Sequence, residues 1–129
     1  MYKIIILLSL LIPISLSASE PSRNDLVGQA LVDYGKVAGG WFISQRCDFL
    51  SPEQAASFKS DVANITVALG KDLGSPAMLY QVQQSAKTST DSEKYSGCGE
   101  RNKDIVTAVT AQAKAWSEQI IKLQSAENG

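Results

Sequence analysis

The sequence has 129 residues, of which 44% are hydrophobic and 19% are charged, and this composition suits one globular domain. Its formal net charge of −1 becomes −2 without Lys3, which is the one charged residue before Glu20. No basic cluster follows that lysine, so nucleic acid and anionic lipid surfaces are poor candidates for a partner. The chain contains no histidine, so the commonest general base, triad member and haem ligand is absent.

The beginning of the chain has the features of an export signal. Lys3 precedes an apolar run over residues 4–12, Pro13 ends the run, and small residues suited to signal peptidase follow. We predict a cleaved signal peptide over 1–19, a single helical domain over 20–129, and a periplasmic or secreted location. The apolar run has about half of the 20 or so residues that a membrane span needs, so we expect no stable span after cleavage.

The chain has two cysteines, Cys47 and Cys98. In an oxidising compartment, two cysteines about 50 residues apart are most simply one structural disulfide. Free thiols, a metal pair and a redox C-x-x-C motif are the alternatives, but no such motif occurs and no histidine could complete a zinc site. We therefore predict a Cys47–Cys98 disulfide worth roughly 4 kcal/mol in the chain-entropy model, and no metal or cofactor.

A first helix is predicted from Ser22. Its apolar residues alternate at spacings of four and three, namely Val27, Leu31, Tyr34, Ala38 and Trp41. Three glycines border that face: Gly28, Gly35 and Gly39. Glycine in a helix costs up to about 1 kcal/mol relative to alanine, so their clustering indicates a closely crossing helix or, alternatively, a frayed one.

At the pair Gly39-Gly40 the apolar phase slips, because Ile43, Cys47 and Leu50 form a stripe nearly opposite the first. We predict a bend at this pair that uses a positive backbone angle. The competing interpretation is a straight helix whose glycines admit a close neighbour.

Three further helices follow. Ser51 to Gln54 forms a capping box with proline at the first helical position, and Gly70 or Gly74 can end that helix. Ser75-Pro76 starts a shorter helix to about Lys87.

Residues 88–99 are small and polar and predict a loop. A final helix of about 35 Å should begin near Glu100. The tail over 125–129 is expected to be frayed.

No segment alternates with period two, so the predicted fold is all-α. We expect a small four-helix bundle-like domain stapled by one disulfide.

The candidate binding residues surround the cysteines. Tyr95 stands in the polar loop three residues before Cys98, where it could anchor a partner or cover the disulfide. Four charged residues adjoin the cysteines, namely Arg46, Asp48, Glu100 and Arg101. A disulfide would bring them within reach of one another, as a local ion-pair cluster or as a binding patch. No catalytic residue is predicted, because the helical aspartates fall on polar faces.

The segment Trp41…Cys47-Asp-Phe-Leu and the lysine-bearing helix from Cys98 to Trp116 resemble the small periplasmic acid-stress chaperones of the HdeA and HdeB type. The resemblance covers two short windows of the chain. It implies an all-helical fold in which one disulfide joins similarly spaced cysteines.

The expected function is non-enzymatic protein binding by an exported helical protein, as a periplasmic chaperone, an inhibitor or an accessory subunit. One alternative is an immunity protein against a secreted toxin. Another is a carrier of an apolar small ligand, in a cavity lined by the glycine face beside Trp41 and Phe42.

Overall fold

The computed structural model describes residues 22–128; the expected signal peptide over 1–19 lies outside the described residues. The described part consists of α2 (Arg23–Arg46), α3 (Pro52–Leu73), α4 (Pro76–Thr90), the short 3-10 helix η1 (Glu93–Tyr95) and α5 (Glu100–Asn128). No strand occurs in this part, and the predicted all-α fold with one disulfide is confirmed.

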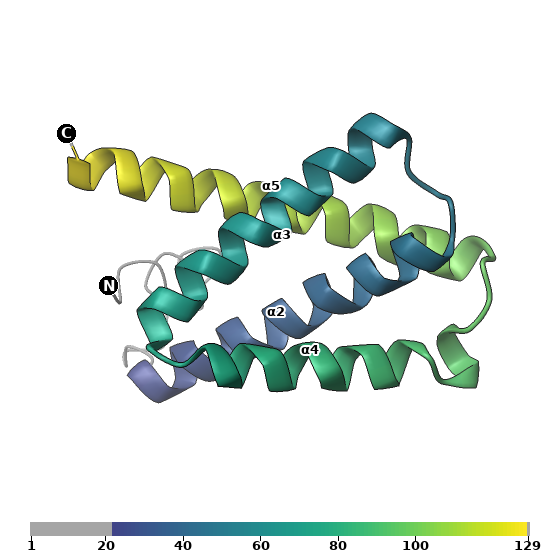
Figure 1. Cartoon of the computed structure of the whole chain (residues 1–129), viewed down its shortest axis with the longest axis horizontal. Helices are drawn as coiled ribbons and strands as arrows, with labels where there is room; N and C mark the ends of the chain where they lie inside the picture. The colour runs from purple at the N-terminus through teal and green to yellow at the C-terminus, as the bar shows by residue number, and fades with distance from the viewer. Residues whose placement is uncertain (1–21, 129) are drawn as a thin grey trace, which may run out of the picture.

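Helix α2 is the central element, since it packs against α4, α5 and α3. Helix α3 also packs against α5 and, less extensively, against α4. Within residues 22–128, α4 and α5 make no extensive contact with each other. The turn between α3 and α4 lies at one end of the molecule, and the α2–α3 and α4–α5 connections lie at the other (Figure 1).

Local capping sets the starts of α2 and α3. The predicted capping box of α3 is confirmed. The backbone amide of Gln54 donates to the Ser51 hydroxyl at 3.1 Å, and the backbone amide of Ser51 donates to the side-chain oxygen of Gln54 at 2.9 Å. Helix α2 has a second capping box, formed by Ser22 and Asp25. Gly74 ends α3 in the left-handed conformation at φ 67°, where a side chain would be strained.

Two helix ends differ from the prediction. Helix α4 continues past Lys87 to Thr90, and the hydroxyls of Thr88 and Thr90 donate to carbonyls of the preceding turn. Thr90 is buried against the α2 glycine face, so tertiary packing extends the helix. Helix α5 continues through the tail expected to fray, as far as Asn128, and its 29 residues span about 43 Å.

The main core lies between α2, α3 and α5, with Leu79 reaching it from α4. Trp41 and Phe58 meet edge to face, with ring centroids 5.5 Å apart. Trp116 is also buried, so both tryptophans belong to the core, as predicted. The buried Tyr34 hydroxyl pairs with the Thr66 hydroxyl at 2.9 Å and accepts from the Gln83 amide at 2.6 Å, which links α2 to α3 and α4.

The predicted bend at Gly39-Gly40 is wrong. Helix α2 is continuous through the pair, and neither glycine has a positive φ. The pair instead admits close neighbours on two sides. A Cβ on Gly39 would lie 3.5 Å from Thr90 of α4, and a Cβ on Gly40 would lie 2.5 Å from Val109 of α5. The out-of-phase stripe exists because Ile43 and Cys47 enter a second core cluster with Val106.

Candidate functional site

The disulfide joins the end of α2 to the loop before α5. Cys47 and Cys98 are bonded with their Cα atoms 5.5 Å apart, which confirms the predicted pairing. Cys47 is buried in the second core cluster, whereas Cys98 is exposed. The bond therefore ties an exposed loop to the core.

Tyr95 and Arg46 fix the position of that loop. Tyr95 is half-buried, and its ring packs against the cluster of Ile43, Cys47 and Val106, as expected for a residue that covers the disulfide. The Arg46 guanidinium donates to the Tyr95 carbonyl and forms an ion pair with Asp91 at 3.4 Å. The loop between α4 and α5 is thus held to the end of α2 from two directions.

The other candidate charges do not form the expected cluster. Asp48, Glu100 and Arg101 are exposed, and within residues 22–128 no ion pair links them to one another or to Arg46. The Arg101 guanidinium lies over the Tyr95 ring, 5.5 Å from its centroid, and Lys94 lies 5.3 Å from the same centroid. This end of the molecule therefore presents one half-buried ring with two cations above it.

Asn102 is a buried residue that the sequence interpretation missed. Its amide donates to the carbonyls of Tyr95 and Gly97, so the first turn of α5 also holds the loop. The signal was available, since Asn102 precedes Val106 and Val109 by four and seven residues and shares their apolar face.

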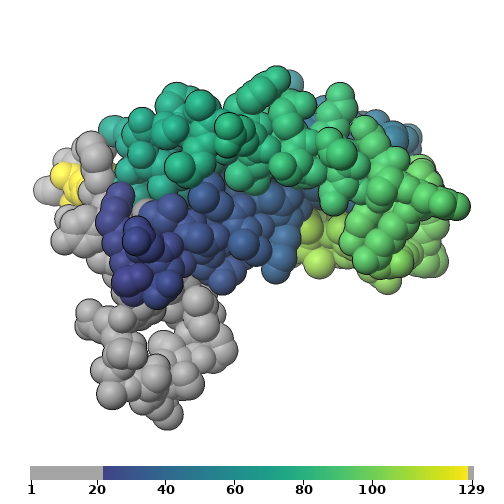
Figure 2. All heavy atoms as spheres, turned by 90° about the horizontal axis from the view of Figure 1, so that it is seen from below, coloured from purple at the N-terminus to yellow at the C-terminus, as the bar shows by residue number. Residues whose placement is uncertain are grey.

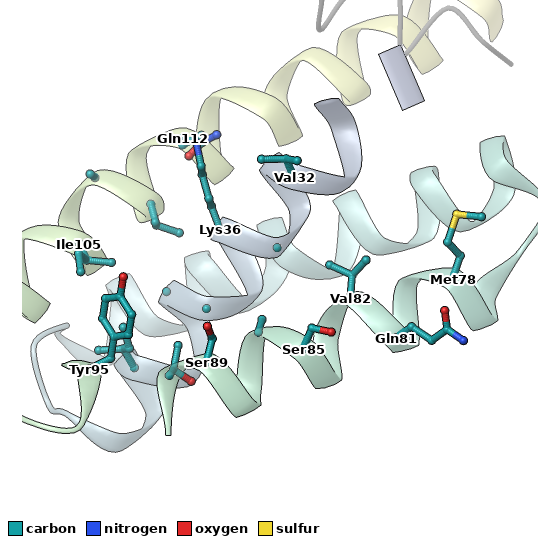
Figure 3. Close-up of a pocket in the computed structure, with 18 residues that line it drawn as sticks. Val32, Lys36, Met78, Gln81, Val82, Ser85, Ser89, Tyr95, Ile105 and Gln112 are labelled. Atoms are coloured by element: carbon teal, nitrogen blue, oxygen red, sulfur yellow. The ribbon is translucent and has the colours of Figure 1, made fainter. Parts of the chain in front are cut away.

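A groove runs along α2 on the side where α4 and α5 do not meet. Its volume is about 860 Å³. Figure 2 shows α2 (blue) beside α4 (teal to green) on this side of the molecule, and Figure 3 shows the groove in close-up. The lining residues from α2 are Val32, Gly35, Lys36, Gly39, Gly40 and Ile43; those from α4 are Met78, Gln81, Val82, Ser85, Ala86, Ser89 and Thr90; the others are Tyr95, Ile105, Ala108, Val109 and Gln112.

The glycine face forms the α2 side of this groove. A Cβ on Gly35 would lie 3.5 Å from Val82 and a Cβ on Gly39 would lie 3.5 Å from Thr90, so α4 packs against this face at ordinary van der Waals distance from a methyl group. Trp41 and Phe42, which were expected beside a cavity, do not line it. Trp41 instead packs against Phe58 of α3.

The groove has an apolar surface with neutral polar groups at its edges. Val32 and Met78 are exposed at one end, and Tyr95 and Ile105 stand at the other (Figure 3). Within the described part of the chain, Lys36 is the one charged residue in the lining. Such a surface is suited to bind an apolar or amphipathic ligand. Its described lining offers no pair of side chains for general acid–base catalysis.

No group of three or more histidine, cysteine, aspartate or glutamate residues within 22–128 could hold a metal ion. Asp72, near the end of α3, is a buried carboxyl. Burial raises the pKa of Asp72, and the charge of Arg23 offsets part of the rise. Asp72 lies outside the groove lining, and because it is buried, the prediction that the helical aspartates fall on polar faces is wrong for this residue.

The comparisons with known proteins give no relative. No family model matches the chain, and neither a curated protein nor a solved structure is significantly similar to it. Among the helices of the described part, none combines the length and apolar character of a membrane span.

Proposed function

We propose that this chain is an exported, non-enzymatic binding protein that takes an amphipathic helix of a partner protein into the groove between α2, α4 and α5. The observation that supports the proposal is the groove itself. Two helices flank α2 without closing over it, so the bundle lacks a helix on this side. A helix laid in such an apolar groove is a recurring mode of protein recognition.

The dimensions of the groove favour a helix as the occupant. At 1.5 Å per residue, the lining stretch of α2 from Val32 to Ile43 is about 17 Å long, and that of α4 from Met78 to Thr90 is about 18 Å long. The volume then corresponds to a mean cross-section of about 50 Å². A helix 10–12 Å in diameter, embedded to half its depth, occupies about 40–55 Å². An occupant of about three helical turns would fill the groove.

A photo-cross-linking residue at Ser85, in the lining of the groove, tests the proposal. Gln84 provides the control position, because it is exposed on the same helix but lies outside the lining. We expect a helical segment of a partner to cross-link to position 85 and not to position 84. The identified partner, once purified, should bind the wild-type chain and lose affinity for Ser85→Trp but not for Gln84→Trp. Equal cross-linking at both positions would contradict the proposal.

The same experiment separates the protein-binding roles. One stoichiometric partner would indicate an inhibitor, an accessory subunit or an immunity protein. Many partners that share amphipathic segments would indicate a chaperone.

A second candidate is a carrier of an apolar small ligand. It is favoured by the volume of the groove, which lies within the 300–1,000 Å³ typical of small-molecule sites. Mass spectrometry of the natively purified chain would detect a bound lipid or pigment, and a stoichiometric one would favour this function over helix binding.

A further inference from the structure

Lys36 is the single charged side chain among the described residues that line the groove. It lies one turn from Val32 on α2, and its side chain extends across the groove toward Gln112 of α5 (Figure 3). Lys36 is exposed and makes no ion pair or hydrogen bond with any residue in the described part of the chain. Of residues 22–128, no carboxylate lines the groove to neutralise it.

A helix seated in the groove would remove water from the ammonium of Lys36. Covering a charge without a partner is costly, whereas a carboxylate at hydrogen-bond distance offsets the lost hydration. An amphipathic helix with only neutral or basic residues would therefore bind less favourably than one with an acid at this point. The other polar groups of the lining are neutral and do not repel a carboxylate.

We propose that the groove selects an amphipathic helix with an aspartate or glutamate at the edge of its apolar face, placed to pair with Lys36. This inference rests on the proposed function and names the chemistry of its partner. The polar groups also orient the helix. Because Lys36 extends toward α5, the acid lies at the α5 edge, while Gln81, Ser85 and Ser89 of α4 face neutral polar residues of the partner.

The inference can be tested with three synthetic amphipathic helical peptides of about 14 residues, a little longer than the groove. They share one apolar face and differ at a single position beside it, which is glutamate, glutamine or lysine. Fluorescence anisotropy of the labelled peptides with the full chain gives the three dissociation constants. We expect the glutamate peptide to bind about fivefold more tightly than the glutamine peptide, and the lysine peptide to bind most weakly.

Charge reversal provides the decisive variant. Lys36→Glu should invert the order, so that the lysine peptide binds most tightly. Lys114→Glu is the matched control, because Lys114 is an exposed lysine of α5 outside the lining, and it should leave the order unchanged. Both substitutions are at exposed positions, and circular dichroism would verify that the variants remain folded.

The outcomes separate this inference from the function on which it rests. If all three peptides bind equally and Ser85→Trp abolishes their binding, the groove binds helices and the selection for an acid is wrong. If Lys36→Glu leaves the order unchanged, the selection is again wrong. If no peptide binds, or if Ser85→Trp has no effect, both the proposed function and the inference fail. If the chain binds dodecanoate, a simple apolar ligand, and binds none of the peptides, the proposed helix binding and the selection for an acid are both contradicted.

Discussion

At the scale of single residues, Gly40 shows how closely α5 approaches α2. A Cβ at this position would lie 2.5 Å from Val109 Cγ1 and 2.8 Å from Val109 Cβ. Because one of these atoms is directly attached to the α5 backbone, the helix itself must shift to accept a methyl group. We expect Gly40→Ala to lower the free energy of unfolding by about 1–3 kcal/mol, measured by denaturant unfolding.

The matched control for this substitution is Gly28→Ala. Gly28 lies in the same helix, and a Cβ there would meet nothing within 4 Å. The gain in helix propensity then has no opposing contact, so stability should rise by a few tenths to about 1 kcal/mol. If Gly40→Ala proved as stabilising as Gly28→Ala, the close packing against Val109 would be refuted.

Asp72 is a second residue with a measurable effect. It is buried, and neither of its carboxylate oxygens has a hydrogen-bond partner in the part of the chain that the structure describes. It also lies at the C-terminal end of α3, where the helix dipole disfavours negative charge. Burial raises the pKa of Asp72 above its ordinary value of 3.8, so the folded state binds this proton more tightly than the unfolded state does.

The sign of the pH dependence follows from this shift. As the pH rises from 3.8 through the raised pKa, the carboxyl ionises and the fold loses stability. Asp72→Asn should therefore stabilise the protein at pH 7, by about 0.3–1 kcal/mol as is typical of removing a negative charge from this end of a helix, and the gain should disappear below pH 3.8. Chemical unfolding of both proteins at pH 3 and pH 7 measures this, and an equal gain at both values would rule out the burial of an ionised carboxyl as its cause.

At the scale of elements, the disulfide holds the 91–99 loop to the end of α2 together with the Arg46 contacts. It closes a loop of 51 residues, for which the chain-entropy model gives about 4 kcal/mol. Replacing both Cys47 and Cys98 by serine should lower the free energy of unfolding by about 2–5 kcal/mol. The reduced wild-type protein is the control and should unfold at nearly the same denaturant concentration as the double variant. A double variant as stable as the oxidised protein would show that the loop is held without the bond.

The helices of this fold were largely predictable because their signals are local. The capping box at Ser51 and Gln54 sets the start of α3, and a left-handed glycine at 74 ends it. The similar capping box of Ser22 and Asp25 at the start of α2 is also a local signal, but it was not predicted. The end of α4 could not be predicted from the sequence. Thr90 remains helical because it is buried against α2, and this burial is a tertiary contact.

The groove could be predicted only in part. The glycine face indicated a close helix crossing, and Gly35 and Gly39 do meet α4. Apolar periodicity shows which face of a helix is buried but not which helix covers it. For this reason the sequence could not show that α4 and α5 would flank α2 without meeting, or that Gln81, Ser85 and Ser89 would line the space between them.

At the scale of the whole molecule, the open groove leaves α4 with fewer buried side chains than α2, α3 or α5. Of its large apolar residues only Leu79 is fully buried, whereas α2 buries residues along its length from Ala30 to Ile43. Segments with few buried contacts open locally at lower free energy than the core does. The contact of Val82 with the glycine face and the Gln83–Tyr34 hydrogen bond help to hold the middle of α4.

Amide hydrogen exchange should reveal this difference. We expect the amides of residues 81–88 to exchange faster than those of residues 34–43 in α2, and faster than those of residues 106–117 in α5, which bury a comparable apolar face. An amphipathic peptide in the groove would contact α4 and α5 together and join the two helices that the free protein leaves apart. Its binding should slow exchange in α4 more than in α3, which contributes nothing to the groove lining. If α4 is already as protected as α2 in the free protein, the weaker support inferred for α4 is refuted.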